Sequence, residues 1–273
     1  MRIALVDNGS LEPAAHESLR AAALAIGERA HAPVEAVSWK HSGRIPAARL
    51  HAGAAQTLAP WIRAHVAAGE RDFVVVPFFV SPEGSIGSAL AGDIEALRAE
   101  IGPFTVAFSE GLSPDSTLPA IMAERIREAA ASLRLRHPSV VVVDHGGPSM
   151  NSALIRNRVA DGVRDSLGGF IGPLVASSME SPDGPGFDFN RPLFAEALAM
   201  KGFNSGSVLV APLFLSPGRH AGPAGDLRKI ARGAEAAAPG LRCHFTQLIG
   251  THPKAIDALA GALARVLRVG SHS

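Results

Sequence analysis

The chain has 273 residues, of which 47% are hydrophobic and 19% charged, an ordinary globular composition that excludes disorder as the main state. Lys and Arg number 26 against 25 Asp and Glu, so the net charge of +1 gives no global basic field for nucleic acid or an anionic membrane. The single cysteine, Cys243, cannot form an intramolecular disulfide, and no apolar stretch reaches the roughly 18–20 residues of a membrane helix, so we expect a cytoplasmic protein without nucleic-acid or membrane partners.

Short apolar runs rich in β-branched residues alternate with stretches of helical composition along the whole chain. In the first half these runs predict strands at Ile3–Val6, Val34–Ser38, Phe73–Phe79 and Thr105–Phe108, followed by a helix at Leu118–Leu133. In the second half they predict strands at Val140–Val143, Ile171–Ala176, Val208–Phe214 and His244–Leu248. This alternation is typical of βαβ units that bury a parallel sheet. The predicted fold class is therefore α/β, with four parallel strands in each half.

The two halves share a set of short motifs in the same order. The matched pairs are Leu5–Ser10 with Val142–Gly147, Pro77–Pro82 with Pro212–Pro217, Gly92–Ile94 with Gly225–Leu227, and Pro119 with Pro253. Several matches in one order and at nearly constant spacing indicate a duplicated domain. We therefore expect two repeats, residues 1–136 and 137–273, with the boundary near Arg134–Pro138.

Polar side chains follow three predicted strands of the second half. His145 comes directly after the first of these strands, Glu180 after the second and His220 after the third. Because ligands of an open parallel sheet sit beyond the carboxyl ends of its strands, we expect the three side chains to converge there. Two imidazoles and one carboxylate suit a divalent first-row metal such as iron or cobalt and leave open coordination positions.

The first half keeps the framework of these loops but not their chemistry. Asn8 stands at the position of His145 and Ser85 at that of His220, whereas Gly9 and Ser81-Pro82 persist. Residues needed only for folding should persist in both repeats, so this difference favours a function in the second half. His41 lies near the position that corresponds to Glu180, and we expect it to be a surface residue.

Each candidate also has an ordinary structural interpretation. A strand-end histidine taken alone is more often a loop hydrogen-bonding residue than a metal ligand, and a lone Glu180 fits a helix N-terminus or a solvated surface. His252 precedes a proline near the start of the last helix, where a capping role is expected. Cys243 is expected to be a core residue rather than a nucleophile.

The motifs around the three candidate residues resemble the class II sirohydrochlorin chelatases of the CbiX/SirB type. In that family the first strand ends in His-Gly-Ser, a mid-domain Glu is followed by Pro, and the third strand ends in Pro-x-Phe-Leu-x-x-Gly-x-His. His145-Gly146 and Pro212–His220 carry the resemblance, which extends from about Val140 to Val266. Gly147 takes the place of the family serine, and the loop after the mid-domain Glu is unusually rich in Gly and Pro. Long members of the family are tandem repeats of flavodoxin-like domains, in agreement with the duplication.

The resemblance implies ATP-independent insertion of Co²⁺ or Fe²⁺ into sirohydrochlorin or a related tetrapyrrole, in cobalamin or siroheme biosynthesis. The divalent metal is then a substrate, and no organic cofactor is expected. His145 and His220 would serve both as metal ligands and as proton acceptors, because the ordinary imidazole pKa near 6.5 suits both roles. Glu180 would be a ligand or a proton relay. The chain would be a monomer or a homodimer.

A tetrapyrrole with many carboxylates requires basic or polar residues around the site. The resemblance assigns substrate contacts to Arg219, Ser216 and Gly146. Arg219 would hold a substrate carboxylate through its planar guanidinium group. A locally basic cleft is expected, and its candidate residues are Arg156, Arg158, Arg191, Arg219 and Lys40.

Two other classes of function remain open from the sequence. A non-catalytic family member would bind metal or tetrapyrrole for transfer, and turnover with sirohydrochlorin and Co²⁺ separates it from an enzyme. A phosphate-handling enzyme would seat an anion on backbone N–H groups at Asp144–Gly147 and use His145 as a nucleophile. The sequence has neither a P-loop nor a G-x-G-x-x-G motif at either first strand, which disfavours phosphoryl chemistry.

Overall fold

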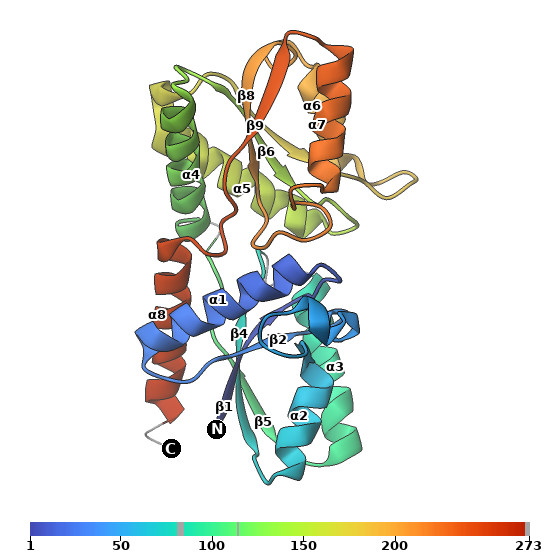
Figure 1. Ribbon diagram of the computed structural model, residues 1–273, viewed down its shortest axis with the longest axis vertical. Coiled ribbons are helices and arrows are strands. Elements are labelled where there is room, and N and C mark those ends of the chain that lie inside the picture. Colours follow the sequence, from blue (N-terminus) through green and yellow to red (C-terminus); the bar gives the residue numbers. More distant parts are fainter. Residues whose placement is uncertain (81–84, 114, 271–273) are drawn as a thin grey trace. The chain divides into compact units, whose positions relative to one another are not determined.

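The computed structural model describes residues 1–80, 85–113 and 115–270, which form two compact units (Figure 1). Unit 1 contains the described residues of Met1–Leu112, Ser216–Gly218 and Gly250–Ser273. Unit 2 contains those of Ser113–Leu215 and Arg219–Ile249. Each unit is a parallel sheet with helices on both faces, which confirms the α/β class.

Unit 1 is built on a five-stranded sheet with the order β3-β2-β1-β4-β5. Its strands are β1 (Arg2–Asp7), β2 (Glu35–Ser38), β3 (Gln56–Thr57), β4 (Asp72–Pro77) and β5 (Thr105–Phe108). Its helices are α1 (Pro13–Ala30), α2 (Leu58–Ala67), α3 (Ser85–Ile101) and α8 (Pro253–Gly270), with short 3₁₀ turns at Ser42–Arg44 and Ala47–Arg49. Apolar residues of β1 and β4 pack with those of α2 and α3 in one core cluster, and α1 packs beside α8.

Unit 2 is built on a four-stranded sheet with the order β7-β6-β8-β9. Its strands are β6 (Ser139–Asp144), β7 (Leu174–Ser178), β8 (Gly206–Pro212) and β9 (Leu241–Phe245). Its helices are α4 (Thr117–Leu133), α5 (Met150–Leu167), α6 (Phe194–Ala199) and α7 (Asp226–Ala237), with 3₁₀ turns at Gly168–Phe170 and Asp188–Asn190. The four valines of β6, residues 140–143, are fully buried, because helices cover both faces of a parallel sheet.

The strand predictions hold, with one addition. All eight strands expected from the apolar runs are present, and Thr105–Phe108 has the expected bounds. The order β2-β1-β4-β5 in unit 1 and the order in unit 2 are the same, as expected for two flavodoxin-like sheets. The expectation of four strands in each half is wrong for unit 1, where β3 adds an edge strand. β3 has two residues, a glutamine and a threonine, and so offered no apolar run to detect.

The last helix of each half of the sequence belongs to the compact unit of the other half. α4 comes from the first half and packs against α5 in unit 2, whereas α8 comes from the second half and packs against α1 in unit 1. An ion pair of 2.5 Å between Arg29 and Asp257 joins α1 to α8. The compact units therefore differ from the halves 1–136 and 137–273, and the duplication itself stays a prediction from the sequence. Within the described ranges, no helix is both long and apolar enough to cross a membrane.

Candidate functional site

Three strand ends of unit 2 bring the predicted site residues together. His145 follows β6 and His220 follows β8, and their ring centroids lie 4.6 Å apart with an interplanar angle of 85°. Glu180 follows β7, and its Oε1 lies 3.7 Å from Nε2 of His145. The side chains of His145 and Glu180 are about half exposed, at 46% and 57%. The structure thus places two imidazoles and a carboxylate at one open edge of the sheet.

Each imidazole uses its Nδ1 atom for a protein contact. Nδ1 of His145 lies 3.1 Å from the carbonyl oxygen of Gly146, and Nδ1 of His220 lies 3.0 Å from Oδ2 of Asp226. A proton on each Nδ1 satisfies these acceptors and leaves the Nε2 lone pair available to a metal or a proton. A second partner of this kind, usually a carboxylate or a carbonyl, is typical of metal-binding histidines.

The electrostatic surroundings of His220 favour its neutral form. Burial, and next the neighbouring His145, lower the pKa of His220 below its usual value, while the hydrogen bond to Asp226 opposes this shift. Lys229, and then His220, hold the pKa of Asp226 below its usual value. A neutral imidazole beside an ionised carboxylate is the protonation state that a metal ligand requires.

Among residues 1–80, 85–113 and 115–270, no three His, Cys, Asp or Glu side chains already have the mutual geometry of a metal site. The rings of His145 and His220 meet edge to face, with their centroids 4.6 Å apart. Rotation about χ1 and χ2 of the exposed His145 and Glu180 side chains would redirect their donor atoms. The site is therefore a set of neighbouring donors that a metal would draw together.

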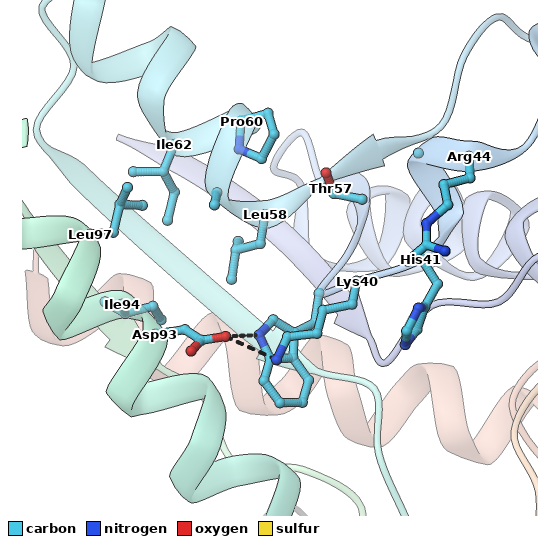
Figure 2. Close-up of a pocket in the computed structure, with 13 residues that line it drawn as sticks. Lys40, His41, Arg44, Thr57, Leu58, Pro60, Ile62, Asp93, Ile94 and Leu97 are labelled. Carbon is cyan, nitrogen blue, oxygen red and sulfur yellow. Dashed lines mark hydrogen bonds and ion pairs between the residues drawn. The ribbon is translucent and has the colours of Figure 1, made fainter. Parts of the chain in front are cut away.

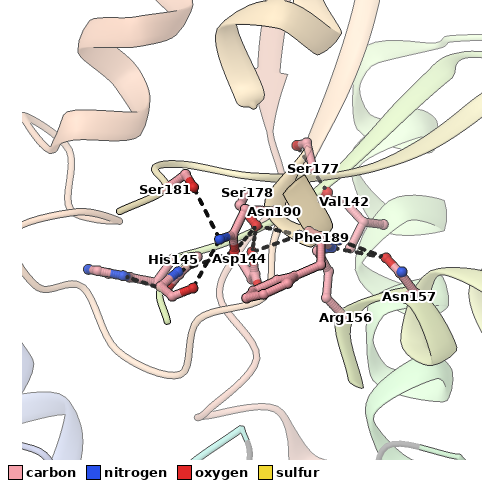
Figure 3. A network of polar contacts seen from close by, with 12 residues as sticks. Val142, Asp144, His145, Arg156, Asn157, Ser177, Ser178, Ser181, Phe189 and Asn190 are labelled. Atoms are coloured by element: carbon pink, nitrogen blue, oxygen red, sulfur yellow. Dashed lines mark hydrogen bonds and ion pairs between the residues drawn. The ribbon is translucent and has the colours of Figure 1, made fainter. Parts of the chain in front are cut away.

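A buried polar network lies beneath the loop that carries His145 (Figure 3). Arg156 of α5 is only 1% exposed; its guanidinium group donates to the Ser178 hydroxyl and to the carbonyl of Phe189 at 2.8 Å, and lies 3.6 Å from Asp144. Ser178 donates to Asp144 at 2.7 Å. Burial raises the pKa of Asp144, and the hydrogen bond from Ser178 and then the charge of Arg156 oppose that shift. The network anchors the ends of β6 and β7, from which His145 and Glu180 project.

Asn190 clamps the turn that follows His145. The amide nitrogen of Asn190 donates to the carbonyl of Gly147 at 2.9 Å. The amide oxygen of Asn190 accepts from the N–H of Gly147 at 3.2 Å. Gly146 has a φ of +83°, and a Cβ atom there would lie 1.9 Å from the carbonyl oxygen of Glu180. The sequence predicted a substrate contact for Gly146; the structure shows a position where the His145 and Glu180 loops approach too closely for a side chain.

Several residues of this site escaped the sequence prediction. Asn190 and Ser178 carried no recognisable motif, because each acts through contacts between distant loops. Asp226 had a signal, since Gly225-Asp226 is one of the motifs repeated as Gly92-Asp93. The repetition indicates duplication and does not by itself point to the site.

The arginines predicted to make the cleft basic have different roles. Arg156 is buried, so the prediction that it meets substrate is wrong. Arg158 is paired with Asp115 and Arg191 with Glu196, on the surface of unit 2.

The two remaining predicted contacts lie after β8. Arg219 is 80% exposed and its Nε lies 3.5 Å from Asp226, which leaves most of its guanidinium group in solvent. The Ser216 hydroxyl is buried and has no hydrogen-bond partner among the described residues. Cys243 lies in β9, where burial raises the pKa of its thiol to about 12, which fits the prediction that it is not a nucleophile.

Unit 1 repeats the backbone of this site with different side chains. The N–H of Glu180 donates to the carbonyl of His145 at 3.1 Å, and the N–H of Lys40 donates to the carbonyl of Asn8 at the same distance. Gly9, with a φ of +88°, approaches the carbonyl of Lys40 as Gly146 approaches that of Glu180. The backbone register therefore places Lys40, rather than the neighbouring His41, at the position of Glu180.

Two other positions of the first half complete this comparison. Ser85, the sequence counterpart of His220, begins α3. Ser81 and Pro82, which the sequence repeat also matched, lie outside the described residues. Of the three site positions in unit 1, the structure therefore describes the side chains at Asn8 and Lys40, and neither is a usual ligand of a divalent transition metal.

Comparison with solved structures identifies the class of fold. SirB from Bacillus subtilis with Fe³⁺ superimposes with a TM-score of 0.69 at 13% sequence identity, covering 100% of this chain and 98% of that chain. The sirohydrochlorin chelatase SirB from Bacillus subtilis subspecies spizizenii in complex with cobalt superimposes with a TM-score of 0.64 at 16% sequence identity. The match covers 100% of this chain and 98% of that chain. CbiX, described as the terminal enzyme for biosynthesis of siroheme in denitrifying bacteria, superimposes with a TM-score of 0.64 at 15% sequence identity. The match covers 97% of this chain and 99% of that chain. The fold is that of a chelatase.

The sequence model of the CbiX family matches residues 2–129 and 176–266, which include Glu180 and His220. The chain belongs to the CbiX/SirB family of class II sirohydrochlorin chelatases. None of the curated protein sequences matches the chain. His145 lies between the two matched segments, so its place in the site depends on the geometry described above.

Proposed function

We propose that this protein inserts Co²⁺ or Fe²⁺ into sirohydrochlorin or a related tetrapyrrole without nucleotide hydrolysis, in the cytoplasm. The observation that carries the proposal is the imidazole pair of unit 2, with ring centroids 4.6 Å apart and Glu180 3.7 Å from His145. Membership of the chelatase family supports it, as do the iron and cobalt present in two structures of the same fold. The metal is a substrate in this reaction.

The reaction exchanges two protons for one metal ion. As bonds form between the metal and the ring nitrogens, the two pyrrole N–H protons must leave, and solvent carries them away after a first acceptor takes them. The protein contacts of both imidazoles through Nδ1 leave Nε2 available for either task, and Oε1 of Glu180 lies 3.7 Å from Nε2 of His145, within reach to relay a proton. We assign metal delivery and proton acceptance to these three residues together.

Arg219 supports recognition of an anionic ring. It precedes His220 and is 80% exposed, and its contact with Asp226 at 3.5 Å leaves N–H donors facing solvent. A guanidinium group of this kind binds a carboxylate through two parallel hydrogen bonds. We assign it to a peripheral carboxylate of the tetrapyrrole, one residue away from the metal donors.

Metal insertion can be followed by the change in visible absorbance of sirohydrochlorin. The protein is mixed with sirohydrochlorin and Co²⁺, Fe²⁺ or Ni²⁺ in separate reactions without nucleotide, and the rate is compared with the protein-free reaction. We expect catalytic turnover with Co²⁺ or Fe²⁺ and its loss in His220→Ala. Asn8→Ala, at the corresponding strand end of the first half, is the matched control and should change the rate only modestly.

The second candidate function is transfer of metal or tetrapyrrole without insertion. It is favoured by the absence of a preformed three-residue metal geometry in the described part of the chain. A protein of that kind would bind Co²⁺ or sirohydrochlorin with defined stoichiometry but would not accelerate the absorbance change. Binding measured by calorimetry, together with a rate equal to the protein-free reaction, would establish transfer and contradict insertion.

A further inference from the structure

Unit 1 contains a pocket of about 520 Å³ between the end of β2 and helices α2 and α3 (Figure 2). Its floor consists of the apolar side chains Leu58, Ile62, Ile94 and Leu97, each no more than 4% exposed. The volume lies in the range of about 300–1,000 Å³ usual for small-molecule sites, which combine apolar walls with a few polar groups. The pocket therefore has the size and the floor of a site for a small organic molecule.

The rim of this pocket carries an excess of positive charge. Lys40, His41 and Arg44 line it, and Asp93 is the one acidic residue among the described lining residues. The Asp93 carboxylate accepts a hydrogen bond from Trp39 Nε1 at 2.9 Å and pairs with Lys40 Nζ at 3.2 Å. Within the described residues, the Arg44 guanidinium group has no hydrogen-bond or ion-pair partner. The described rim thus carries two permanent cations and one carboxylate, and that carboxylate is paired with Lys40.

The charge of this site is reversed relative to its counterpart in unit 2. Lys40 occupies the backbone position of Glu180, and Asp93 corresponds in the sequence repeat to Asp226. In unit 2 the aspartate holds His220 next to His145, which itself lies 3.7 Å from the Glu180 carboxylate, and these donors suit a metal cation. In unit 1 the aspartate holds an ammonium group, fixed at 3.8 Å over the Trp39 ring. The same framework therefore presents a cation, which attracts an anion.

We propose that the unit 1 pocket binds a carboxylate attached to an apolar, ring-sized body. The carboxylate pairs with the guanidinium fork of Arg44, Lys40 adds positive charge to the same rim, and the body displaces water from the floor at Leu58 and Ile94. Arg binds carboxylates through two parallel hydrogen bonds, and each carbon atom of the ligand that is buried against the apolar floor adds favourable free energy of binding. This proposal does not depend on metal insertion by unit 2.

Two sources can supply this chemistry. The ligand is a free aromatic or aliphatic acid, or it is one carboxylate arm of a larger molecule such as the proposed tetrapyrrole substrate. Both need the same cations and the same floor, so the pocket residues alone do not separate them. A competition experiment between a small acid and sirohydrochlorin separates the two sources.

The test uses naphthalene-1-acetate and its neutral analogue naphthalene-1-acetamide, titrated into the metal-free full-length protein and followed by saturation-transfer NMR. We expect the acid to bind at least about tenfold more tightly than the amide, since a charge-assisted pair adds roughly this factor. Arg44→Gln should weaken binding of the acid about tenfold, Lys40→Gln should weaken it by a smaller factor, and neither should change the affinity for the amide. Arg49→Gln, at another exposed arginine outside the pocket, is the matched control and should change neither affinity.

Each result has a defined meaning. If sirohydrochlorin displaces the acid, and Arg44→Gln raises the KM of metal insertion at unchanged kcat, the carboxylate belongs to the tetrapyrrole. If the acid binds in the presence of saturating sirohydrochlorin, the ligand is an independent acid. The proposal is overturned if acid and amide bind with equal affinity or if neither binds. It is also overturned if Arg49→Gln weakens binding of the acid as much as Arg44→Gln does. Because no metal is present in the titration, failure here is distinguishable from failure of metal insertion.

Discussion

Replacing Asp7 by Asn should stabilise unit 1 at neutral pH. Asp7 ends β1, is 9% exposed, and has one carboxylate oxygen that is buried without a hydrogen-bond partner among the described residues. Burial raises its pKa from 3.8 to about 6, although the neighbouring Ser38 side chain and the Gly9 backbone act in the opposite direction. The charged carboxylate is therefore less favourable in the folded protein than in the unfolded chain.

The pKa difference gives both the sign and the size of the effect. Asp7 holds its proton more tightly when folded, so its contribution to stability is complete below pH 4 and is lost as the pH rises to about 6. A shift from 3.8 to about 6, at 1.36 kcal/mol per pH unit, corresponds to a loss of about 3 kcal/mol above pH 6. Asn carries no charge and its amide can donate to Ser38, so Asp7→Asn should recover most of this free energy.

Tryptophan fluorescence isolates the unit concerned, because both tryptophans, Trp39 and Trp61, lie in unit 1. Urea unfolding of wild type and Asp7→Asn at several values between pH 4 and pH 8 gives the difference in unfolding free energy. We expect little difference at pH 4 and a gain of about 3 kcal/mol for the variant at pH 7.5. A difference that stays constant over this range, or a variant less stable at pH 7.5, would refute the reasoning.

Three further predictions concern unit 2. His145→Ala and His220→Ala should abolish metal insertion, and each should lower stability by about 0.5 kcal/mol because a partly exposed imidazole buries little surface; equal loss of activity in Asn8→Ala would contradict a single site. Gly146→Ala should lower both the thermal midpoint and Co²⁺ affinity, since a Cβ would meet the Glu180 carbonyl at 1.9 Å, and an unchanged midpoint in calorimetry would count against this. Arg156→Leu should cost about 3 kcal/mol in urea unfolding followed by circular dichroism, because it leaves the buried Asp144 carboxylate without its cation and the Phe189 carbonyl without its donor, and a cost below about 1 kcal/mol would show that the network is not structural.

The sequence predicted the fold well because its signals are local. A parallel sheet buried on both faces requires runs such as Val140–Val143, and each expected run corresponds to an observed strand. The edge strand Gln56–Thr57 has no such run, because two residues at a sheet edge bury little side chain. Strands that the core determines could thus be predicted, whereas a strand held by backbone pairing could not.

The sequence predicted the side chains that project into the candidate site. It did not predict the buried residues that hold their loops in place. His145, Glu180 and His220 follow strands and so share an edge for topological reasons. The contacts of Asn190 and Arg156 depend on how two loops and a helix pack, which no periodicity encodes. Charge misled the interpretation of Arg156, since a guanidinium group is usually exposed and here is enclosed with its acceptors.

The exchange of last helices fixes the order in which the two units can be completed during synthesis. Unit 2 has its last residue at Ile249, whereas unit 1 begins with Met1 but needs α8, residues 253–270. On the ribosome, the unit that starts second is therefore finished first, and the face of α1 that packs against α8 stays uncovered until α8 has been synthesised. A nascent chain stopped at residue 250 would hold a complete unit 2 beside an incomplete unit 1. Added as a separate peptide, residues 251–273 would then supply the missing helix.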